Sequence, residues 1–220
     1  MSNTKHNMNN TKHNIENENS IGENGYRNSL APESKESIGE NGYRNSPSPS
    51  RERGLGEESL FPRVGMGYDV HQLVEGRDLW LGGIKIEHNK GLLGHSDADV
   101  LIHAICDALL GAANLRDIGY HFPDTSDKTL NMDSKIILKK TMELLADKGY
   151  VLGNIDATVC AEHPKLNPHI PAMKTCLAQV IGCDEDQISI KATTTEKLGF
   201  TGREEGISAY AVALIAKALP

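Results

Sequence analysis

Positive charge, long apolar runs and cysteine pairs are all scarce in this chain of 220 residues. Its 23 Lys and Arg are outnumbered by 30 Asp and Glu, which gives a formal net charge of −7. This balance argues against a general binder of nucleic acids or anionic membranes, because both need a basic face. The longest apolar stretch, 209–219, is interrupted by Lys217 and is shorter than the roughly 18 to 20 residues that cross a bilayer. We therefore expect no transmembrane segment.

The four cysteines, Cys106, Cys160, Cys176 and Cys183, are far apart and lie among apolar neighbours. They form no Cys-x-x-Cys pair, so their spacing does not fit a zinc knuckle. Residues 1–19 also contain no apolar segment of the kind that a secretory signal needs. We therefore expect reduced core cysteines in a cytoplasmic protein.

Residues 1–59 differ in composition from the rest of the chain. They contain 11 Asn and 9 Ser and almost no large apolar side chains, so they cannot bury enough surface to offset the entropy of ordering. Two short sequences occur twice, at 3–7 and 10–14 and at 20–29 and 37–46. Nine Glu against seven Lys and Arg argue against an organelle transit peptide, a class that is poor in acids. We predict a disordered leader over 1–59 and a folded domain over 60–220.

Apolar periodicity beyond residue 60 predicts alternating strands and helices. The predicted strands are 63–73, a hairpin of 79–81 and 84–86 around Gly82–Gly83, 150–161, 188–195 and 207–219. The predicted helices are 96–110, opened by Ser96 and stopped by Gly111; 133–148, capped by Asp133 and closed by Gly149; and 170–181. Residues 112–132 are predicted as a loop long enough to suggest a function. This order predicts an α/β chain of the α+β two-layer sandwich type, with a mixed four-stranded sheet, helices on one face and a small β-hairpin.

A candidate metal site begins on the first predicted strand, where Asp69 and His71 are two residues apart. A carboxylate and an imidazole therefore project from the same face. His103 lies within a predicted helix among apolar neighbours, where a hydrogen-bonded core histidine is the usual arrangement, and Asp107, one turn later, could hold its ring. The Asp-x-His pattern alone is weak, but together these residues would give zinc three ligands and leave a fourth position open for a substrate oxygen.

Three further segments carry groups suited to phosphate, each with an ordinary structural alternative. Residues 94–99 place a histidine, a hydroxyl and two acids at a helix start, where free N–H groups favour an anion, although Ser96 could simply cap the helix. Residues 192–197 combine threonines with a lysine and a carboxylate suited to Mg²⁺, or form an edge strand. Arg203, in the glycine-rich segment 199–206, would clamp a phosphate or be a solvated surface residue.

Several segments also match one known family in the same order along the chain. They are Gly67–His71, Gly91–Asp99, Asp117–Gly119 with Phe122–Thr125, Pro164–Leu166 with Pro168–Ile170, and Lys191–Arg203. The chain resembles the 2-C-methyl-D-erythritol 2,4-cyclodiphosphate synthases of non-mevalonate isoprenoid (terpenoid) biosynthesis. The resemblance covers essentially all of 62–220 and does not extend to the leader; the last segment is the most specific.

The resemblance implies a homotrimer of α/β subunits around a central axis, with active sites shared between neighbours. The implied substrate is 4-diphosphocytidyl-2-C-methyl-D-erythritol 2-phosphate, a cytidine diphosphate compound whose 2-phosphate attacks the β-phosphorus intramolecularly. The implied products are 2-C-methyl-D-erythritol 2,4-cyclodiphosphate and CMP, so the enzyme would be a phosphorus–oxygen lyase. No general base is needed, because the nucleophile is already an anion.

The resemblance also implies roles for individual residues. Asp69, His71 and His103 would hold Zn²⁺, and Glu196 would hold the Mg²⁺ or Mn²⁺ that bridges the substrate diphosphate. The implied transition-state-stabilising, catalytic residues are His95 and Thr194. Ser96, Asp117 and the loop after it would hold the methylerythritol part, residues 161–167 would form the cytosine pocket of the neighbouring subunit, and Phe200 and Arg203 would complete the phosphate end. The full implied substrate-binding set is Asp69, Val70, His71, His95, Ser96, Asp117, Ile118, Gly119, Phe122, Pro123, Asp124, Thr125, Ser126, Ala161, Glu162, His163, Pro164, Lys165, Leu166, Asn167, Thr193, Thr194, Thr195, Glu196, Phe200 and Arg203.

Small departures and two rival functions remain at this point. Glu162 and His163 stand in a variable part of the pocket loop, and the region around Lys128 does not align with the family. A zinc-dependent phosphohydrolase would use the same open metal site to activate water and would release free phosphate. A non-catalytic nucleotide-binding module would be expected to have lost at least one of the four implied metal ligands, and all four are present.

Deleting residues 1–59 tests the predicted leader. We expect cyclisation to proceed at an unchanged rate, because a disordered extension contributes nothing to the geometry of a metal site. Steady-state turnover of the full and shortened chains measures this, and a large loss on truncation would show that the leader has a role.

Overall fold

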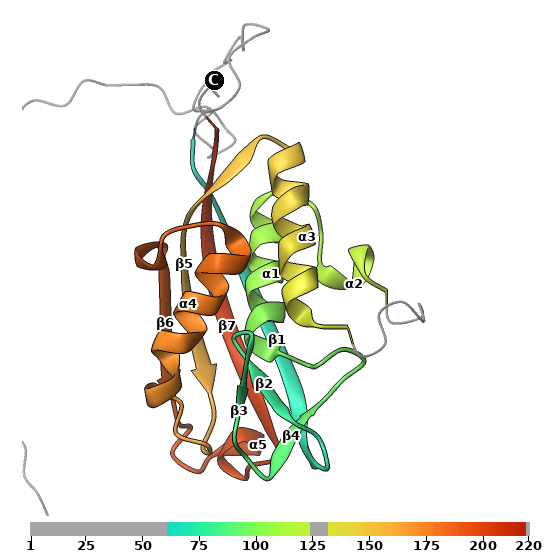
Figure 1. Cartoon of the computed structure of the whole chain (residues 1–220), viewed down its shortest axis with the longest axis vertical. Helices are drawn as coiled ribbons and strands as arrows, with labels where there is room; N and C mark the ends of the chain where they lie inside the picture. Colours follow the sequence, from blue (N-terminus) through green and yellow to red (C-terminus); the bar gives the residue numbers. More distant parts are fainter. Residues whose placement is uncertain (1–60, 124–131, 219–220) are drawn as a thin grey trace, which may run out of the picture. The chain divides into compact units, whose positions relative to one another are not determined.

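The computed structural model describes residues 61–123 and 132–218 (Figure 1). The predicted leader over 1–59 and residues 124–131 of the long loop, including Lys128, lie outside the described residues. The strands are β1 (Arg63–Glu75), β2 (Leu79–Leu81), β3 (Ile84–Ile86), β4 (Lys90–Leu93), β5 (Tyr150–Cys160), β6 (Ile188–Thr193) and β7 (Gly206–Lys217). The helices are α1 (Val100–Ala112), α2 (Ile118–His121), α3 (Ser134–Asp147), α4 (Ile170–Ile181) and α5 (Gly199–Gly202), with 3₁₀ turns η1 (Asn167–His169) and η2 (Glu185–Gln187). None of the helices in these two ranges has the length and apolar character needed to cross a membrane.

Five strands form one mixed sheet in the order β4-β1-β7-β5-β6. All neighbours are antiparallel except β5 and β6, which are parallel. The predicted sheet of four strands is therefore wrong by one strand, because β4 pairs with the end of β1, where Leu73 faces Leu92. Four residues that include a glycine and a lysine show no alternation, so periodicity does not reveal this strand. The hairpin β2–β3 forms separately around Gly82–Gly83, as predicted.

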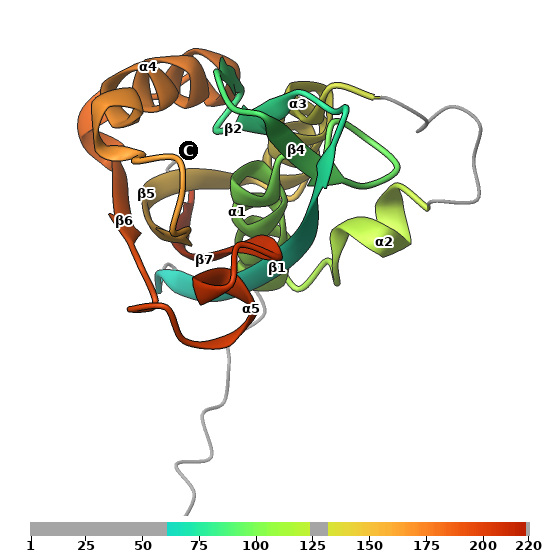
Figure 2. The ribbon, with the colours of Figure 1, turned by 90° about the horizontal axis from the view of Figure 1, so that it is seen from below.

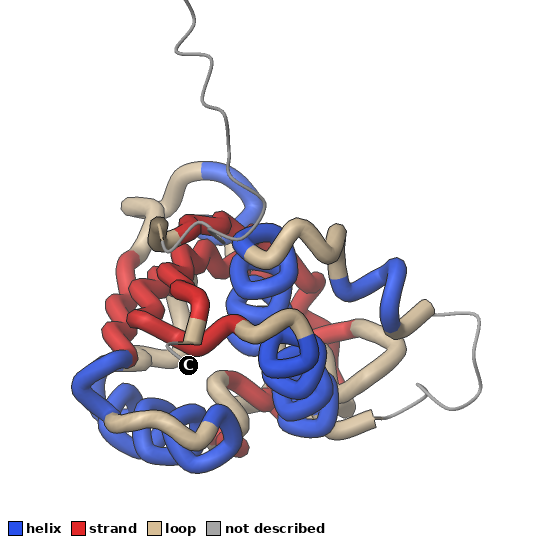
Figure 3. Tube along the Cα trace, turned by 90° about the horizontal axis from the view of Figure 1, so that it is seen from above, coloured by secondary structure: helices blue, strands red, loops and turns tan. Residues whose placement is uncertain are grey.

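The helices α1, α3 and α4 lie on the same face of the sheet, which confirms the predicted two-layer sandwich (Figures 1, 2 and 3). Helix α1 packs on β1 and β7, and α4 packs on β6 and α3. Side chains on the inner face of β7, such as Ala209, Ala211 and Ala213, are buried against this layer. The four cysteines are unpaired, as predicted, but only Cys106 is buried in the core; Cys160, Cys176 and Cys183 are partly exposed, so the prediction of core positions is wrong for these three.

Helix α1 contacts β1 so closely that two positions of the strand must be glycine. A Cβ at Gly65 would lie 2.0 Å from the carbonyl oxygen of Ala108, and one at Gly67 would lie 2.0 Å from that of Ala104. Because these obstacles are backbone atoms, no side-chain rotation can relieve the overlap. The two glycines and the alanines that face them therefore set the separation of the helix from the sheet.

Helix α1 begins and ends later than the sequence pattern predicts. Its N-cap is Asp99, whose buried carboxylate accepts from the N–H groups of Ile102 (3.0 Å), Gly82 (2.9 Å) and Gly83 (2.7 Å). The prediction that Ser96 opens the helix is therefore wrong, and so is the stop at Gly111, which lies inside the helix. Both hairpin glycines have positive φ, +61° and +78°, as a type I′ turn requires. One carboxylate thus anchors both the helix start and the hairpin turn.

The remaining predicted strands and helices are confirmed, and their observed ends differ from the predicted ends by no more than two residues. Asp133 caps α3 by accepting from the N–H of Lys135, and Gly149 follows the helix with φ +70°. The predicted loop over 112–132 contains the short helix α2, which the sequence pattern does not reveal. Asp117 caps it by accepting from Tyr120 N–H.

Substituting Gly67 by Ala tests the close contact of α1 with β1. We expect a loss of about 2 kcal/mol or more in the free energy of unfolding, because the added methyl group meets backbone. The matched control is Gly111→Ala in α1, where an added Cβ meets nothing within 4 Å. It should stabilise the protein by up to about 1 kcal/mol, because alanine favours the helix. Urea unfolding measures both, and a neutral Gly67→Ala would refute the contact.

Candidate metal centre

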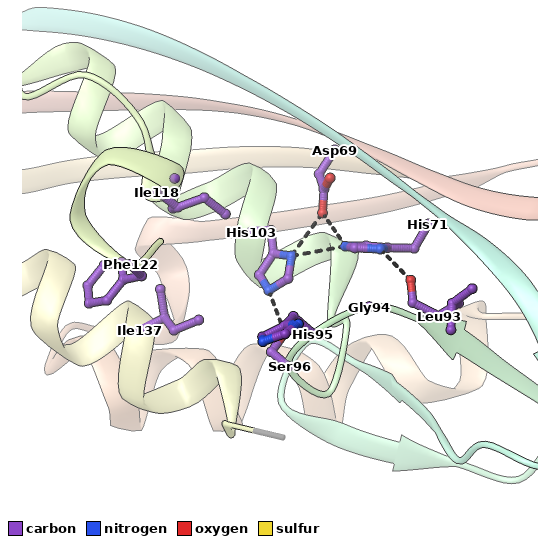
Figure 4. Close-up of a pocket in the computed structure, with 11 residues that line it drawn as sticks. Asp69, His71, Leu93, Gly94, His95, Ser96, His103, Ile118, Phe122 and Ile137 are labelled. Atoms are coloured by element: carbon purple, nitrogen blue, oxygen red, sulfur yellow. Dashed lines mark hydrogen bonds and ion pairs between the residues drawn. The ribbon is translucent and has the colours of Figure 1, made fainter. Parts of the chain in front are cut away.

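Three side chains from two elements converge at one point (Figure 4). Asp69 Oδ2 lies 3.0 Å from His71 Nε2 and 2.9 Å from His103 Nδ1, and the two histidine nitrogens are 3.2 Å apart. Asp69 and His71 share the inner face of β1 because strand side chains alternate. The side chain of His103, on α1, reaches them because that helix lies against the glycines of β1. The structure therefore brings together the three residues that the sequence proposes as metal ligands.

A hydrogen bond to the backbone of β4 orients the ring of His71. Its Nδ1 lies 2.8 Å from the carbonyl oxygen of Leu93, on β4. A carbonyl oxygen only accepts, so Nδ1 donates, and in the neutral ring Nε2 then presents a lone pair to Asp69 and His103. The strand that periodicity misses is thus the one that orients a candidate ligand.

The ring of His103 is held by hydroxyl groups. Its Nε2 lies 3.0 Å from Ser134 Oγ and 3.3 Å from Ser96 Oγ. The hypothesis that Asp107 holds this ring is wrong, because the Asp107 carboxylate instead accepts the N–H of Ile118 and so ties α1 to α2.

The carboxylate of Asp69 is ionised at neutral pH. Partial burial alone would raise its pKa, but the adjoining His103 and His71 rings, whenever either carries a proton toward the carboxylate, outweigh this and hold the pKa well below its usual range. The site therefore combines one negative oxygen with two imidazole nitrogens.

This donor set fits a zinc ion. Zinc in proteins accepts nitrogen and oxygen ligands, and a site with three protein ligands leaves a fourth position open. Ligand atoms around tetrahedral zinc are about 3.3 Å apart, given metal–ligand distances of roughly 2.0–2.1 Å. The three separations of 2.9, 3.0 and 3.2 Å are close to that value. Two imidazoles also favour zinc over magnesium, which prefers oxygen ligands.

The three residues line a cavity of about 290 Å³, which we call the metal cavity. Five other predicted site residues line it too: His95, Ser96, Ile118, Gly119 and Phe122. The remaining lining residues, Leu93, Gly94 and Ile137, are absent from the predicted set. Leu93 and Gly94 lie inside a segment that matches the family, so the resemblance could have identified them as site residues. Ile137 has no such signal, because in sequence it is an ordinary apolar residue of an amphipathic helix.

Other predicted residues near the metal cavity do not line it. The side chain of Val70 lies on the outer face of the sheet, 42% exposed, and Asp117 caps α2. Pro123 is exposed, and Asp124, Thr125 and Ser126 lie outside the described residues.

A second group of predicted residues lies where β5 and β6 end. We call it the Glu162 cluster, and its members come from residues 161–167 and 193–203. Ala161 N–H donates to Thr193 O at 3.0 Å, and Glu162 Oε1 accepts from the N–H groups of Thr195 and Lys197, both at 3.1 Å. These hydrogen bonds lower the pKa of Glu162, that of Lys197 most, so its carboxylate stays charged at neutral pH. The side chain of Glu162 therefore supports the loop in this structure.

The candidate Mg²⁺ residue, Glu196, lies in the same cluster and is exposed. Its Oε1 accepts from Thr194 Oγ1 at 2.7 Å, and Glu196 and Lys197 have positive φ of +51° and +64°. The turn depends on Gly202, because a Cβ there would lie 2.1 Å from the Lys197 carbonyl carbon. Left-handed backbone at two successive non-glycine residues carries strain of the kind that gathers at functional sites.

The other residues of this region take different positions. Leu166 is buried, whereas His163, Lys165 and Asn167 are exposed and Pro164 is partly exposed. Phe200 is 38% exposed, and Arg203 binds Glu205 through two hydrogen bonds of 2.9 Å. None of the residues of 161–167 or 193–203 lines the metal cavity, so within this part of the chain the predicted site residues form two separate groups.

Comparisons with known proteins show which family, sequences and solved structures this chain is similar to. The model of the YgbB family matches residues 62–216. A 2-C-methyl-D-erythritol 2,4-cyclodiphosphate synthase of Bacteroides fragilis is 76% identical over 153 residues, which are 70% of this chain and 96% of that protein. A protein of the same name from Bacteroides thetaiotaomicron is 74% identical over 155 residues, 70% of this chain and 98% of that protein. The solved IspF–CDP complex of Plasmodium falciparum has a TM-score of 0.65 at 36% identity, and the match covers 74% of this chain and all 100% of that one.

Replacing Glu162 by Ala tests its support of the Glu162 cluster. We expect the amides of Thr195 and Lys197 to exchange with deuterium about tenfold faster, because both lose their acceptor. The control, Glu162→Gln, keeps an acceptor oxygen and should change the rates much less. Because the pKa of Glu162 is lowered, the charge-assisted bonds are complete above the ordinary pKa of glutamate and are lost only as the pH falls below it. Equal protection in all three proteins would refute this support.

Proposed function

The chain belongs to the YgbB family, and from that premise we propose that it is a 2-C-methyl-D-erythritol 2,4-cyclodiphosphate synthase. It converts 4-diphosphocytidyl-2-C-methyl-D-erythritol 2-phosphate to 2-C-methyl-D-erythritol 2,4-cyclodiphosphate and CMP, a step of non-mevalonate isoprenoid biosynthesis. The observation that carries this proposal is the open cluster of Asp69, His71 and His103 at the wall of a cavity. The proposed compartment is the cytoplasm.

In the proposed reaction one P–O bond forms and one breaks. An oxygen of the 2-phosphate bonds to the β-phosphorus, and the bond from that phosphorus to the bridging oxygen breaks, so CMP leaves with the electron pair. The nucleophile is an anion, so no side chain has to remove a proton. What the protein must supply is alignment of two mutually repelling phosphates and neutralisation of their charge.

Asp69, His71 and His103 would hold Zn²⁺ in this proposal, and the bound ion would supply Lewis-acid polarisation of a phosphate oxygen and offset of its charge. His95 and Ser96 line the same cavity, and in this proposal they would donate to the phosphate and to the methylerythritol part. Ile118, Phe122 and Ile137 form an apolar wall, which limits the access of water that would hydrolyse the diphosphate.

The Glu162 cluster supplies the other half of the proposed site. Glu196 would hold Mg²⁺ or Mn²⁺, and its exposed carboxylate is the type of ligand that these ions prefer. Thr194, hydrogen-bonded to Glu196, would stabilise the transition state. Residues 161–167 would hold cytosine, and Phe200 and Arg203 would contact the phosphates once Arg203 exchanges Glu205 for substrate.

A homotrimer would bring the two groups together, since no residue of the Glu162 cluster lines the metal cavity within the described chain. The outer face of the sheet supports this assembly. Val64, Met66, Tyr68, Tyr210 and Val212 project from neighbouring positions of β1 and β7 and are each 41–65% exposed. Contiguous exposed apolar side chains mark interaction surfaces. We propose that this face packs on two further copies of the chain, so that one subunit's metal cavity lies beside its neighbour's Glu162 cluster.

³¹P NMR tests the proposed reaction directly. The protein with substrate, Zn²⁺ and Mg²⁺ should release CMP and give two coupled cyclic-diphosphate resonances, and chelation should abolish both. Inorganic phosphate as the product would favour a phosphohydrolase, and an unchanged spectrum with bound nucleotide would favour a binding module.

Replacing His103 by Ala tests its part in the reaction. We expect turnover to fall at least about 100-fold and bound zinc to drop below about one ion per chain, while the assembly stays intact, because one of three ligands is lost. His88→Ala is the control, since His88 is partly buried but lies outside the metal cavity. Full turnover and full zinc content in His103→Ala would remove His103 from the site.

A further inference from the structure

Behind the metal cluster, the second ring nitrogen of His103 faces buried hydroxyl groups. Ser134 Oγ lies 3.0 Å from His103 Nε2, and Ser134 is fully buried at the start of α3. Ser96 Oγ is farther from the same nitrogen, at 3.3 Å, and already accepts the N–H of Ala98. A hydroxyl can donate or accept, so these contacts alone do not decide where the ring carries its proton.

Asp97 decides the direction of the Ser134 hydrogen bond. Ser134 Oγ lies 2.5 Å from Asp97 Oδ1, and Asp97 Oδ2 accepts the N–H of Ser134 at 3.0 Å. An ionised carboxylate only accepts, so the single hydroxyl hydrogen of Ser134 points to Asp97. Ser134 Oγ then offers only lone pairs to His103. An unprotonated Nε2 would face those lone pairs at 3.0 Å, nearer than the Ser96 hydroxyl at 3.3 Å, so the ring donates from Nε2, and Nδ1 is the unprotonated nitrogen that faces Asp69 and His71.

We propose that Asp97 and Ser134 are positioning residues that hold His103 in the tautomer that binds a metal. This inference rests on the proposed metal centre and deepens it. A metal binds only an unprotonated imidazole nitrogen, and a hydrogen bond to the other nitrogen sets which one is free. The carbonyl of Leu93 sets His71 in the same way. The Asp97–Ser134 pair does this for His103, although neither residue belongs to the candidate metal-binding group.

Asp97 also binds the segment that carries Ser134. Its N–H donates to Met132 O at 3.1 Å, so three hydrogen bonds join Asp97 to residues 132–134. This segment and the start of α1 are therefore fixed relative to each other where the ring of His103 lies between them. The arrangement orients the serine hydroxyl without any contact between Asp97 and the metal ligands.

Two substitutions separate this role from simple packing. Ser134→Ala removes the acceptor of the His103 proton. Asp97→Asn keeps the shape but replaces one acceptor by an NH₂ donor. Since Ser134 N–H must donate at 3.0 Å and the Asp99 N–H lies farther from Asp97, at 3.3 Å, the asparagine oxygen should face Ser134 N–H. Its NH₂ group then donates to Ser134 Oγ, the hydroxyl donates to His103 Nε2, and the ring carries its proton on Nδ1.

The first readout is the tautomer of His103, which is measured without substrate in the wild-type protein and in both variants. ¹⁵N NMR of the metal-free wild-type protein at about pH 8, where imidazole is neutral, should show the His103 proton on Nε2. Asp97→Asn should move the proton toward Nδ1, and Ser134→Ala should leave a mixture. A wild-type ring with its proton on Nδ1 would overturn the inference.

The second readout is zinc affinity, measured by competition with a chelator. Both variants should bind zinc about 10- to 100-fold more weakly, the usual effect of losing a partner of a ligating histidine. Asp133→Asn is the control, because Asn also caps helices and Asp133 contacts the backbone and Lys135 rather than His103. Wild-type affinity in both variants would overturn this inference alone, whereas a wild-type protein that binds no zinc would refute the proposed metal centre.

Discussion

The position of His103 relative to Asp69 and His71 depends on how closely α1 approaches β1. The two elements contact each other through Gly65 and Gly67 on the strand and through backbone atoms of the helix. Because the helix atoms that face both glycines are backbone atoms, no side-chain rearrangement can change this separation. A longer separation would move the His103 nitrogen away from the carboxylate with which it now forms a 2.9 Å contact. The glycines of β1 are thus structural residues with a direct consequence for the chemistry of the site.

Carboxylates organise the rest of the site without binding metal themselves. Asp99 holds the start of α1 and the hairpin turn, and Asp97 holds the start of α3 through Ser134. Both acids lie in the short segment before α1, which is thereby tied to the hairpin turn and to the start of α3. The buried carboxylate of Asp99 and the partly buried one of Asp97 are stable here because each accepts several N–H or O–H groups. The dense acidic and hydroxyl character of residues 94–99 therefore has a structural cause in addition to any role with phosphate.

The residues that the proposed reaction would use lie in two separate groups within the described chain. The metal cavity lies between β1, α1 and α2, and the Glu162 cluster lies at the ends of β5 and β6. The exposed apolar sheet face and the separation of the two groups are consistent with the proposed assembly into a ring of copies. In such an assembly, burial of the apolar face would stabilise the oligomer and complete the active site at once.

The sequence by itself determined the order of the main elements, the sandwich class and the candidate ligands, because these follow from local patterns. Alternation along β1 places Asp69 and His71 on one face, and helical spacing identifies α1 and α3. Only the tertiary structure decided the fifth strand β4, the cap at Asp99 in place of Ser96, the partner of Asp107 and the contacts of Ser134 with His103. Each of these depends on a contact between residues distant in sequence, and such contacts leave no periodic signal. For the same reason the sequence does not reveal Ile137 as a cavity residue. An isoleucine can line a cavity or fill the core, and only the fold distinguishes the two positions.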